Sequence, residues 1–330
     1  MNLAGVSLRD RLRRRSVTVV GLVVTATIAT VALPLWLPLV LLIDLVRAPR
    51  RRPLTRLALF GWVWSLTECA GVATALGLWC LGRGRSHRDH YRLMRWWAGR
   101  LMGFMSRAMK LNIAITGAES LDGGNAIVLC RHASLADSLV SAWVITQRGL
   151  WPRYVLKREL LLDPCLDIVG LRVPNTFVAR GAADAAGDLA ALRTMAAGID
   201  ERSVAVIFPE GTRASSAKRE RAYESLRRRQ PDRLNSVGSL HHLIPIRPAG
   251  TIALLEGAPE ADVILAWHTG FDGLDTFAGI IRMLRSGGDP GRFVMRRVRR
   301  GDVPDDLTRW LDEQWAQMDV EIASVLGEVS

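Results

Sequence analysis

Uncharged, apolar residues dominate the first quarter of the chain and form two runs separated by a basic loop. Residues 17–43 contain no charged side chain, and residues 57–81 contain only Glu68. Each run is long enough for a transmembrane helix, which needs roughly 20 apolar residues. The first run is too long for a signal-peptide core and lacks a small-residue cleavage site, so we expect it to be retained. The pattern predicts an N-terminal two-helix membrane anchor over residues 1–82.

Two features of the anchor leave its course through the membrane open. Pro34 and Pro38 should kink the first run, because proline removes a backbone donor and clashes with the preceding turn. The N-terminus, the loop 47–53 and the segment after Leu81 are all rich in arginine, so a simple hairpin cannot keep every basic segment on one side. The two runs either span the bilayer or dip into one leaflet and return. Both alternatives place the C-terminal body on the side of the N-terminus, which we expect to be the cytoplasmic face of the membrane.

Residues 83–110 show a different pattern, in which apolar side chains recur at helical spacing between arginines. The apolar members are Leu93, Trp96, Trp97, Leu101, Phe104, Met105 and Met109, and the basic ones are Arg92, Arg95, Arg100 and Arg107. This pattern predicts a basic amphipathic helix, which suits the lipid headgroup region. The alternative is an ordinary helix that packs its apolar stripe on the protein core.

Short apolar runs alternate with helical patterns from residue 111 to residue 330. We predict strands at 111–116, 126–130, 153–156, 176–179, 204–208, 243–246, 263–267 and 293–298, and helices at 136–146, 184–197 and 305–326. The polar, basic segment 214–235 is predicted to be an exposed helix or a mobile insertion. Alternation of this kind is typical of an α/β domain with a largely parallel central sheet flanked by helices.

Charge and cysteine usage narrow the class of protein. The formal net charge of +12 suits either nucleic acid or an anionic membrane surface. Six of the eleven tryptophans lie in the first hundred residues, as expected for apolar and interfacial segments, so we expect membrane lipids rather than nucleic acid as partners. The four cysteines show no Cys-x-x-Cys spacing, and no carboxylate or third histidine stands at ligand spacing from His241 and His242. We therefore expect neither a disulfide framework nor a metal site.

A histidine and an aspartate follow one of the predicted buried strands. His132 comes directly after the strand at 126–130, and Asp137 falls in the first turn of the next helix. If His132 lies in the loop before that helix, the carboxylate can accept a hydrogen bond from one ring nitrogen and leave the other to take a proton from a hydroxyl. The spacing alone also arises by chance in many proteins.

Cationic side chains stand at the ends of three further predicted strands. A glycine turn, Glu210-Gly211-Thr212-Arg213, follows the strand at 204–208, while Lys157 and Arg180 end two others. In a parallel sheet these ends share one edge, where ligands usually bind. A guanidinium matches phosphate oxygens and a glycine lets backbone amides approach an anion, so the set predicts an anion site. Each cation taken alone is equally consistent with a solvated surface charge.

Taken in order, these motifs resemble those of the glycerolipid acyltransferase family, of the lysophosphatidic acid acyltransferase type. The motifs are His132-x4-Asp137, Leu156-Lys157-Arg158-Glu159-Leu160 with Pro164 and Gly170, Phe177-Val178-Ala179-Arg180, and Phe208-Pro209-Glu210-Gly211-Thr212-Arg213. The resemblance covers roughly residues 110–250. A weaker similarity to the lysocardiolipin acyltransferase branch involves residues 240–250 and the segment from Arg296 to Pro304.

The resemblance implies a reaction and a role for each motif. His132 would be the general base and Asp137 its orienting partner. Glu210, Gly211, Thr212 and Arg213 would belong to the acceptor-binding turn. Arg213, Lys157 and Arg180 would hold phosphate.

A fatty acyl chain would pass from acyl-CoA to the free hydroxyl of a lysophospholipid, most simply 1-acyl-glycerol-3-phosphate, without cofactor or metal. Three alternatives stay open. They are acyl carrier protein as donor, another lysolipid such as lysocardiolipin as acceptor, and a non-catalytic lipid-binding protein of the same fold.

The sequence departs from the family pattern at three positions. Arg131 stands where asparagine is common before the histidine, Ala136 replaces an aromatic before the aspartate, and Ile246 replaces a proline. These departures concern the acceptor more than the reaction class. We expect an unusual acceptor preference, if there is one, to arise at Arg131.

Overall fold

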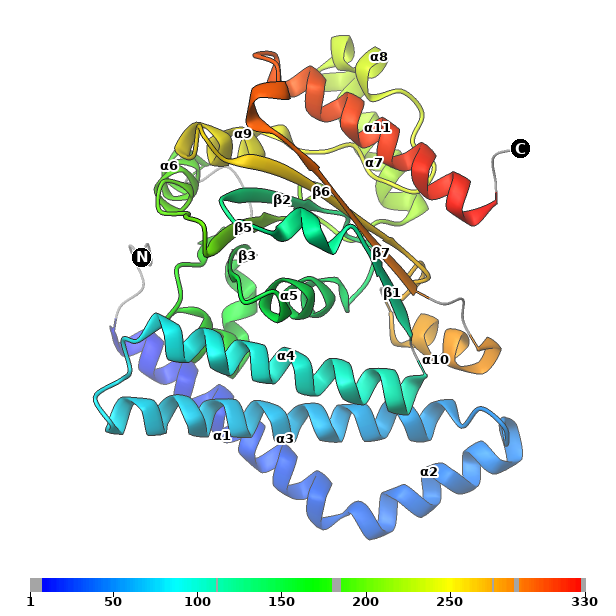
Figure 1. The fold of residues 1–330 in the computed structure, drawn as a ribbon. Helices are drawn as coiled ribbons and strands as arrows, with labels where there is room; N and C mark the ends of the chain where they lie inside the picture. The colour runs from blue at the N-terminus through cyan, green and yellow to red at the C-terminus, as the bar shows by residue number, and fades with distance from the viewer. Residues whose placement is uncertain (1–7, 111, 180–184, 275, 288–290, 328–330) are drawn as a thin grey trace.

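A mostly parallel sheet forms the centre of the protein (Figure 1). The computed structural model describes residues 8–110, 112–179, 185–274, 276–287 and 291–327. Its seven strands are β1 (Ile113–Thr116), β2 (Ala126–Cys130), β3 (Trp151–Lys157), β4 (Thr176–Val178), β5 (Ser203–Ile207), β6 (Asp262–Thr269) and β7 (Gly291–Val298). They lie in the order β1-β7-β6-β2-β5-β3-β4, and every neighbouring pair is parallel except β6 and β7. The predicted fold class is confirmed.

The central strands are apolar on both faces because helices cover both sides of the sheet. Ala126 and Val128 of β2 face a core shared with helices α4 (His87–Met109) and α5 (Asp137–Gln147). Ile127 and Leu129 point the other way, into a second core. Most of the helical residues of this second core come from α6 (Ala185–Ala196), α9 (Pro248–Gly257) and α11 (Leu307–Leu326).

Most strand and helix predictions agree with the structure, but the strand at 243–246 is wrong. This segment is a buried loop whose backbone bonds to side chains instead of a neighbouring strand, since the amide of Leu243 donates to Asp319 Oδ1 at 2.8 Å. The helices α9 and α10 (Phe277–Ser286) were not predicted. The basic segment 214–235 contains the helices α7 (Ser216–Arg229) and α8 (Leu234–Val237).

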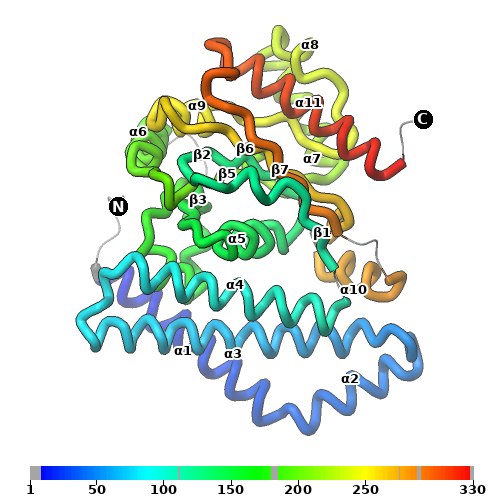
Figure 2. Tube along the Cα trace, viewed as in Figure 1, coloured from blue at the N-terminus to red at the C-terminus, as the bar shows by residue number. Residues whose placement is uncertain are grey.

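The first apolar run forms two helices, α1 (Leu8–Val31) and α2 (Leu33–Arg47), and the second forms α3 (Pro53–Cys80). The chain breaks at Ala32, and Pro34 occupies the first turn of α2, where a missing backbone donor costs little. Pro38 is accommodated inside α2. The junction of α1 and α2 lies farthest from the sheet (Figure 2). Two helices, Arg9–Val31 and Pro53–Cys80, are long and apolar enough to cross a membrane.

Contacts with the body hold both ends of the anchor. Arg14 and Arg15 near the start of α1 pair with the buried carboxylate of Asp167, at 2.8 and 3.3 Å. At the other end, the side chain of Arg51 in the basic loop lies beside Gly287, which ends α10. The N-terminal arginines and the basic loop therefore both lie against the α/β body.

The helix α4 corrects the expectation for residues 83–110. It is amphipathic as predicted, but the apolar members Met105 and Met109 are buried in the core beneath the sheet, and Leu93 packs against Ala75 of α3. Most of the apolar face is therefore unavailable to lipid, as the alternative interpretation held. The exposed face carries the arginines together with Trp96.

Glu68, the one carboxylate within the second apolar run, faces the neighbouring helix. Its Oε1 accepts hydrogen bonds from Trp97 Nε1 of α4 at 2.7 Å and from Trp64 Nε1 at 3.1 Å. These bonds satisfy a buried oxygen that would otherwise be costly inside an apolar helix pair. Glu68 thus joins α3 to α4.

Candidate active site

Four adjacent parallel strands deliver polar side chains to one edge of the sheet. In the order β6, β2, β5 and β3, their carboxyl ends carry His268, His132, the turn that begins at Glu210, and Lys157. Parallel pairing places these ends together, because β2 pairs in parallel with both β5 and β6, and β5 pairs in parallel with β3. The carboxyl edge of such a sheet is the usual place for a ligand site.

His132 and Asp137 form a close pair at this edge. The loop 131–136 places His132 just after β2, and Asp137 is the first residue of α5, so the Nδ1 and Oδ2 atoms lie 2.9 Å apart. A carboxylate can only accept a hydrogen bond, which means that Nδ1 carries the proton and Nε2 is the basic nitrogen. The ring also contacts Phe208 at a centroid distance of 4.7 Å, and its side chain keeps 18% of its surface exposed.

Asp137 is buried and almost fully surrounded by donors. Its Oδ2 accepts from the backbone amides of Ala133 and Ser134 at 2.7 and 2.8 Å, and its Oδ1 accepts from the Ser134 hydroxyl. Burial acts to raise the pKa of this carboxyl, but the charge of His268 and the hydrogen bonds from His132 and His268 outweigh it and hold the pKa well below its usual range. The carboxylate is therefore ionised at neutral pH and able to stabilise a protonated His132.

Glu210 supports the loop that carries His132. Its buried carboxyl accepts from the His132 amide at 3.2 Å and from the Ile244 amide at 3.5 Å. Burial raises the pKa of Glu210 well above its ordinary value. The predicted assignment of Glu210 to the acceptor-binding turn remains untested, and its carboxyl faces the protein interior.

The remainder of the turn closes back on the base. Gly211 adopts a φ of 67°, a region that favours glycine, and the amide of Ala214 donates to the carbonyl of His132 at 2.6 Å. Thr212 and Arg213 are partly buried beside this bond. The structure thus brings the glycine turn and His132 together, as the sequence predicted.

Lys157 and Arg180 are the other two predicted cations. Lys157 is the last residue of β3, at the same edge as the base and partly buried. Arg180 lies outside the described residues. Arg247, which the predicted site did not include, places its side chain 3.4 Å from where a Cβ on Gly211 would stand, so it is a further cation at the turn.

Residues 112–246 match the family model named Acyltransferase. The matched segment contains both the His132–Asp137 pair and the glycine turn. No curated protein matches the chain. Among solved structures, the chain is similar to the 1-acyl-sn-glycerophosphate (LPA) acyltransferase PlsC from Thermotoga maritima, with a TM-score of 0.47 and 15% sequence identity, over 78% of this chain and 94% of that one.

Within the matched segment, Arg131 does not lie at a position from which it could contact an acceptor, as its expected role in acceptor preference requires. Its side chain is fully buried, and its guanidinium binds the carboxylate of Asp272 and the backbone carbonyl of His268. The exposed fraction is 0%, so the residue ties the loop after β2 to the loop after β6. Arg131, which stands in the place of asparagine, is therefore a buried residue that links the loop after β2 to the loop after β6.

His268 is the residue that sequence reasoning missed at this site. It is the penultimate residue of β6 and is buried, and its Nε2 lies 3.1 Å from Asp137 Oδ1. No motif marks it, because its partner is more than a hundred residues away in sequence. A buried polar residue at the end of an otherwise apolar run was the available signal. Among the described residues, no group of three histidines, cysteines or carboxylates could hold a metal ion.

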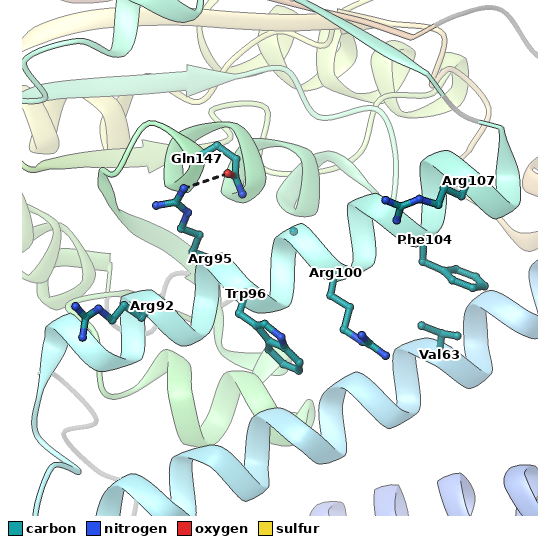
Figure 3. Close-up of a pocket in the computed structure, with 9 residues that line it drawn as sticks. Val63, Arg92, Arg95, Trp96, Arg100, Phe104, Arg107 and Gln147 are labelled. Atoms are coloured by element: carbon teal, nitrogen blue, oxygen red, sulfur yellow. Dashed lines mark hydrogen bonds between the residues drawn. The ribbon is translucent and has the colours of Figure 1, made fainter.

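A groove of about 770 Å³ lies along the exposed face of α4 (Figure 3). Arg92, Arg95, Arg100 and Arg107 line it together with Trp96, Phe104 and Val63 of α3. Gln147, at the far end of α5 from Asp137, accepts a hydrogen bond from Arg95 at 3.4 Å. The groove shares no residue with the candidate active site and lies on the face next to the anchor.

Proposed function

We propose that this protein is a membrane-bound enzyme that transfers a fatty acyl chain from a thioester donor to the free hydroxyl of a lysophospholipid. The observation that carries the proposal is the His132–Asp137 pair, 2.9 Å apart at a sheet edge inside a segment of the acyltransferase family. The glycine turn beside the base and the apolar anchor support a lipid substrate.

The proposed reaction uses His132 as base and then as acid. Nε2 takes the proton from the acceptor hydroxyl, whose oxygen forms the new ester bond with the thioester carbonyl carbon. The carbon–sulfur bond breaks, and the departing sulfur takes the proton back from Nε2. Asp137 stabilises the imidazolium between these two steps. The base is restored at the end, and the transfer needs no group beyond the two substrates.

For the acceptor we propose 1-acyl-glycerol-3-phosphate, which would yield phosphatidic acid. Its phosphate would be held by Arg213, Lys157 and Arg180, since guanidinium groups form paired, charge-assisted hydrogen bonds with phosphate oxygens. Gly211 and Thr212 would shape the turn around this group. Another lysolipid, such as lysocardiolipin, carries the same phosphate chemistry and is the alternative.

For the donor we propose acyl-CoA, with acyl carrier protein as the alternative. The helix α7 begins three residues after Arg213 and ends with three consecutive arginines, Arg227, Arg228 and Arg229. Such a basic helix is able to attract either the phosphates of coenzyme A or an acidic carrier protein. Assays with both donors distinguish them.

We further propose that the anchor holds the catalytic body on the cytoplasmic face of the membrane. Side chains at the junction of α1 and α2 are exposed and apolar, as for Val31 and Leu35, which are 74% and 76% exposed. The arginine groove on α4 stands next to α3 and would meet the anionic headgroups of the same leaflet.

The test offers purified protein oleoyl-CoA or oleoyl-acyl carrier protein with a panel of lysophospholipids and follows the products by mass. We expect a diacyl product from at least one lysolipid, and loss of that product in His132→Gln. The matched control is His87→Gln, which changes an exposed histidine at the start of α4. Equal turnover by His132→Gln and wild type would refute the base. Lipid binding without any product would favour a non-catalytic lipid-binding protein.

A further inference from the structure

His268 stands beside the proposed base through the register of the sheet. Cys130 of β2 pairs with Ala266 of β6, and both His132 and His268 lie two residues beyond that pair. His268 is 2% exposed, whereas the side chain of His132 is 18% exposed. Two histidines thus occupy the same level of the sheet edge, one partly open and one enclosed.

The two imidazoles approach the two oxygens of one carboxylate. His132 Nδ1 lies 2.9 Å from Asp137 Oδ2, and His268 Nε2 lies 3.1 Å from Oδ1. Nδ1 of His268 has no hydrogen-bond partner among the described residues, and the 3.1 Å contact of Nε2 with Asp137 Oδ1 falls short of hydrogen-bond geometry. Burying an imidazole without a polar partner is costly. The contact with Asp137 is the polar interaction that offsets this cost for His268.

The other groups around this contact are fixed by the fold. The ring of His268 packs edge-on against Phe271 at 5.1 Å and parallel to Phe293 at 6.4 Å. The charged and titratable groups nearby are Asp137, His132 and Cys130 from β2 and α5, Arg131 with its partner Asp272, and Glu210 from the turn after β5. Arg131 binds the carbonyl of His268, which anchors the backbone of this residue as well.

We propose that His268 is a positioning residue for the general base: it holds Asp137 Oδ1, so that Oδ2 faces His132 Nδ1, and it sets the basicity of His132. The proposal rests on the proposed function. A donor on Oδ1 withdraws negative charge from the carboxylate, and the carboxylate then stabilises a protonated His132 less strongly. His268 therefore keeps His132 unprotonated, and competent as a base, down to a lower pH.

Removal of the donor should shift the pH profile of kcat/KM in a direction that a merely structural role of His268 would not produce. Without His268, Asp137 would stabilise the imidazolium of His132 more strongly. The acidic limb of the kcat/KM profile would then move to higher pH, by about 0.5–1 pH unit. Loss of alignment between Oδ2 and Nδ1 would also lower kcat, by about tenfold.

The experiment compares two substitutions in the purified full chain. His268→Phe keeps a ring between Phe271 and Phe293 but removes the donor, and His268→Gln keeps a side-chain N–H. We measure kcat/KM from pH 5 to pH 9 (about the range in which histidine titrates) with oleoyl-CoA and 1-oleoyl-glycerol-3-phosphate. His90→Phe, a buried histidine of α4, is the matched control.

We expect the limb to shift in His268→Phe, to shift less in His268→Gln and to stay in place in His90→Phe. An unmoved limb in His268→Phe, with His132→Gln inactive, overturns the role of His268 and leaves the base intact. Wild-type rates in His132→Gln would overturn the base itself. If His268→Phe does not fold, His268→Leu takes its place, because leucine also lacks a donor: a limb shifted to higher pH supports the proposal, and an unmoved limb overturns it.

Discussion

Asp137→Asn tests the pair at the centre of the site while preserving the size of the side chain. Oδ2 accepts three hydrogen bonds, from His132 Nδ1 and the amides of Ala133 and Ser134. An amide oxygen in the same place keeps these bonds but makes them neutral, at a loss of about 1 kcal/mol each. The free energy of unfolding should therefore fall by about 3 kcal/mol at neutral pH.

The catalytic effect of Asp137→Asn should exceed the effect on stability. The proposed reaction places a positive charge on His132, and a neutral amide stabilises it by about 3–5 kcal/mol less than a carboxylate, which corresponds to roughly 10²–10⁴-fold in kcat. The folded protein should remain intact in detergent, so rates can be compared at equal folded concentration.

The stability difference between wild type and Asp137→Asn should also depend on pH in a defined direction. The pKa of Asp137 is depressed in the folded state, so its charge contributes stability above the unfolded pKa of about 4. That contribution is lost as the pH falls below about 4 toward the folded pKa. The difference should be greatest near neutral pH and shrink in acid.

The assay follows release of free thiol from oleoyl-CoA at saturating lysolipid, and urea unfolding gives stability. Asp305→Asn, an exposed aspartate before α11, serves as the control and should match wild type in both. A kcat for Asp137→Asn within about threefold of wild type would refute the reasoning, because a threefold change is below 1 kcal/mol.

Three further predictions concern the acceptor turn and the anchor. Arg213→Ala should raise the KM for lysolipid about tenfold with little change in kcat, relative to Arg221→Ala on α7, and an unchanged KM would contradict phosphate binding. Asp167→Asn should release Arg14 and Arg15, so trypsin should cleave α1 several-fold faster, and equal cleavage would argue against this tie. In a Cys80→Ser background, Arg50→Cys and His87→Cys should react with an impermeant maleimide from the same side, and labelling from opposite sides would exclude the re-entrant arrangement.

Much of the fold was accessible from sequence because its central strands are uniformly apolar. The five residues of β2 and the five of β5 are all buried, which makes each a short unbroken run bounded by polar residues. The segment 243–246 has the same appearance and is not a strand. Its amides bond to Asp319 and Glu210, and local pattern cannot distinguish a buried loop from a strand.

The site was partly accessible for a similar reason. His132 and Asp137 are close in sequence, so one loop suffices to bring them together. His268 reaches Asp137 only through the pairing of β6 with β2, which a single sequence does not reveal. The burial of Arg131 was likewise hidden, since its partner Asp272 lies in the loop after β6.

The position of α4 determines where the chain can be shortened. One side of this helix packs on α5 and the other on α3, where Leu93 meets Ala75 and Trp97 Nε1 donates to Glu68. Removal of residues 1–82 would expose these side chains to water and create an aggregation-prone apolar surface on the remaining fragment. A soluble catalytic fragment would require polar replacements along α4, at Leu93 and Trp97 first, in addition to deletion of the anchor.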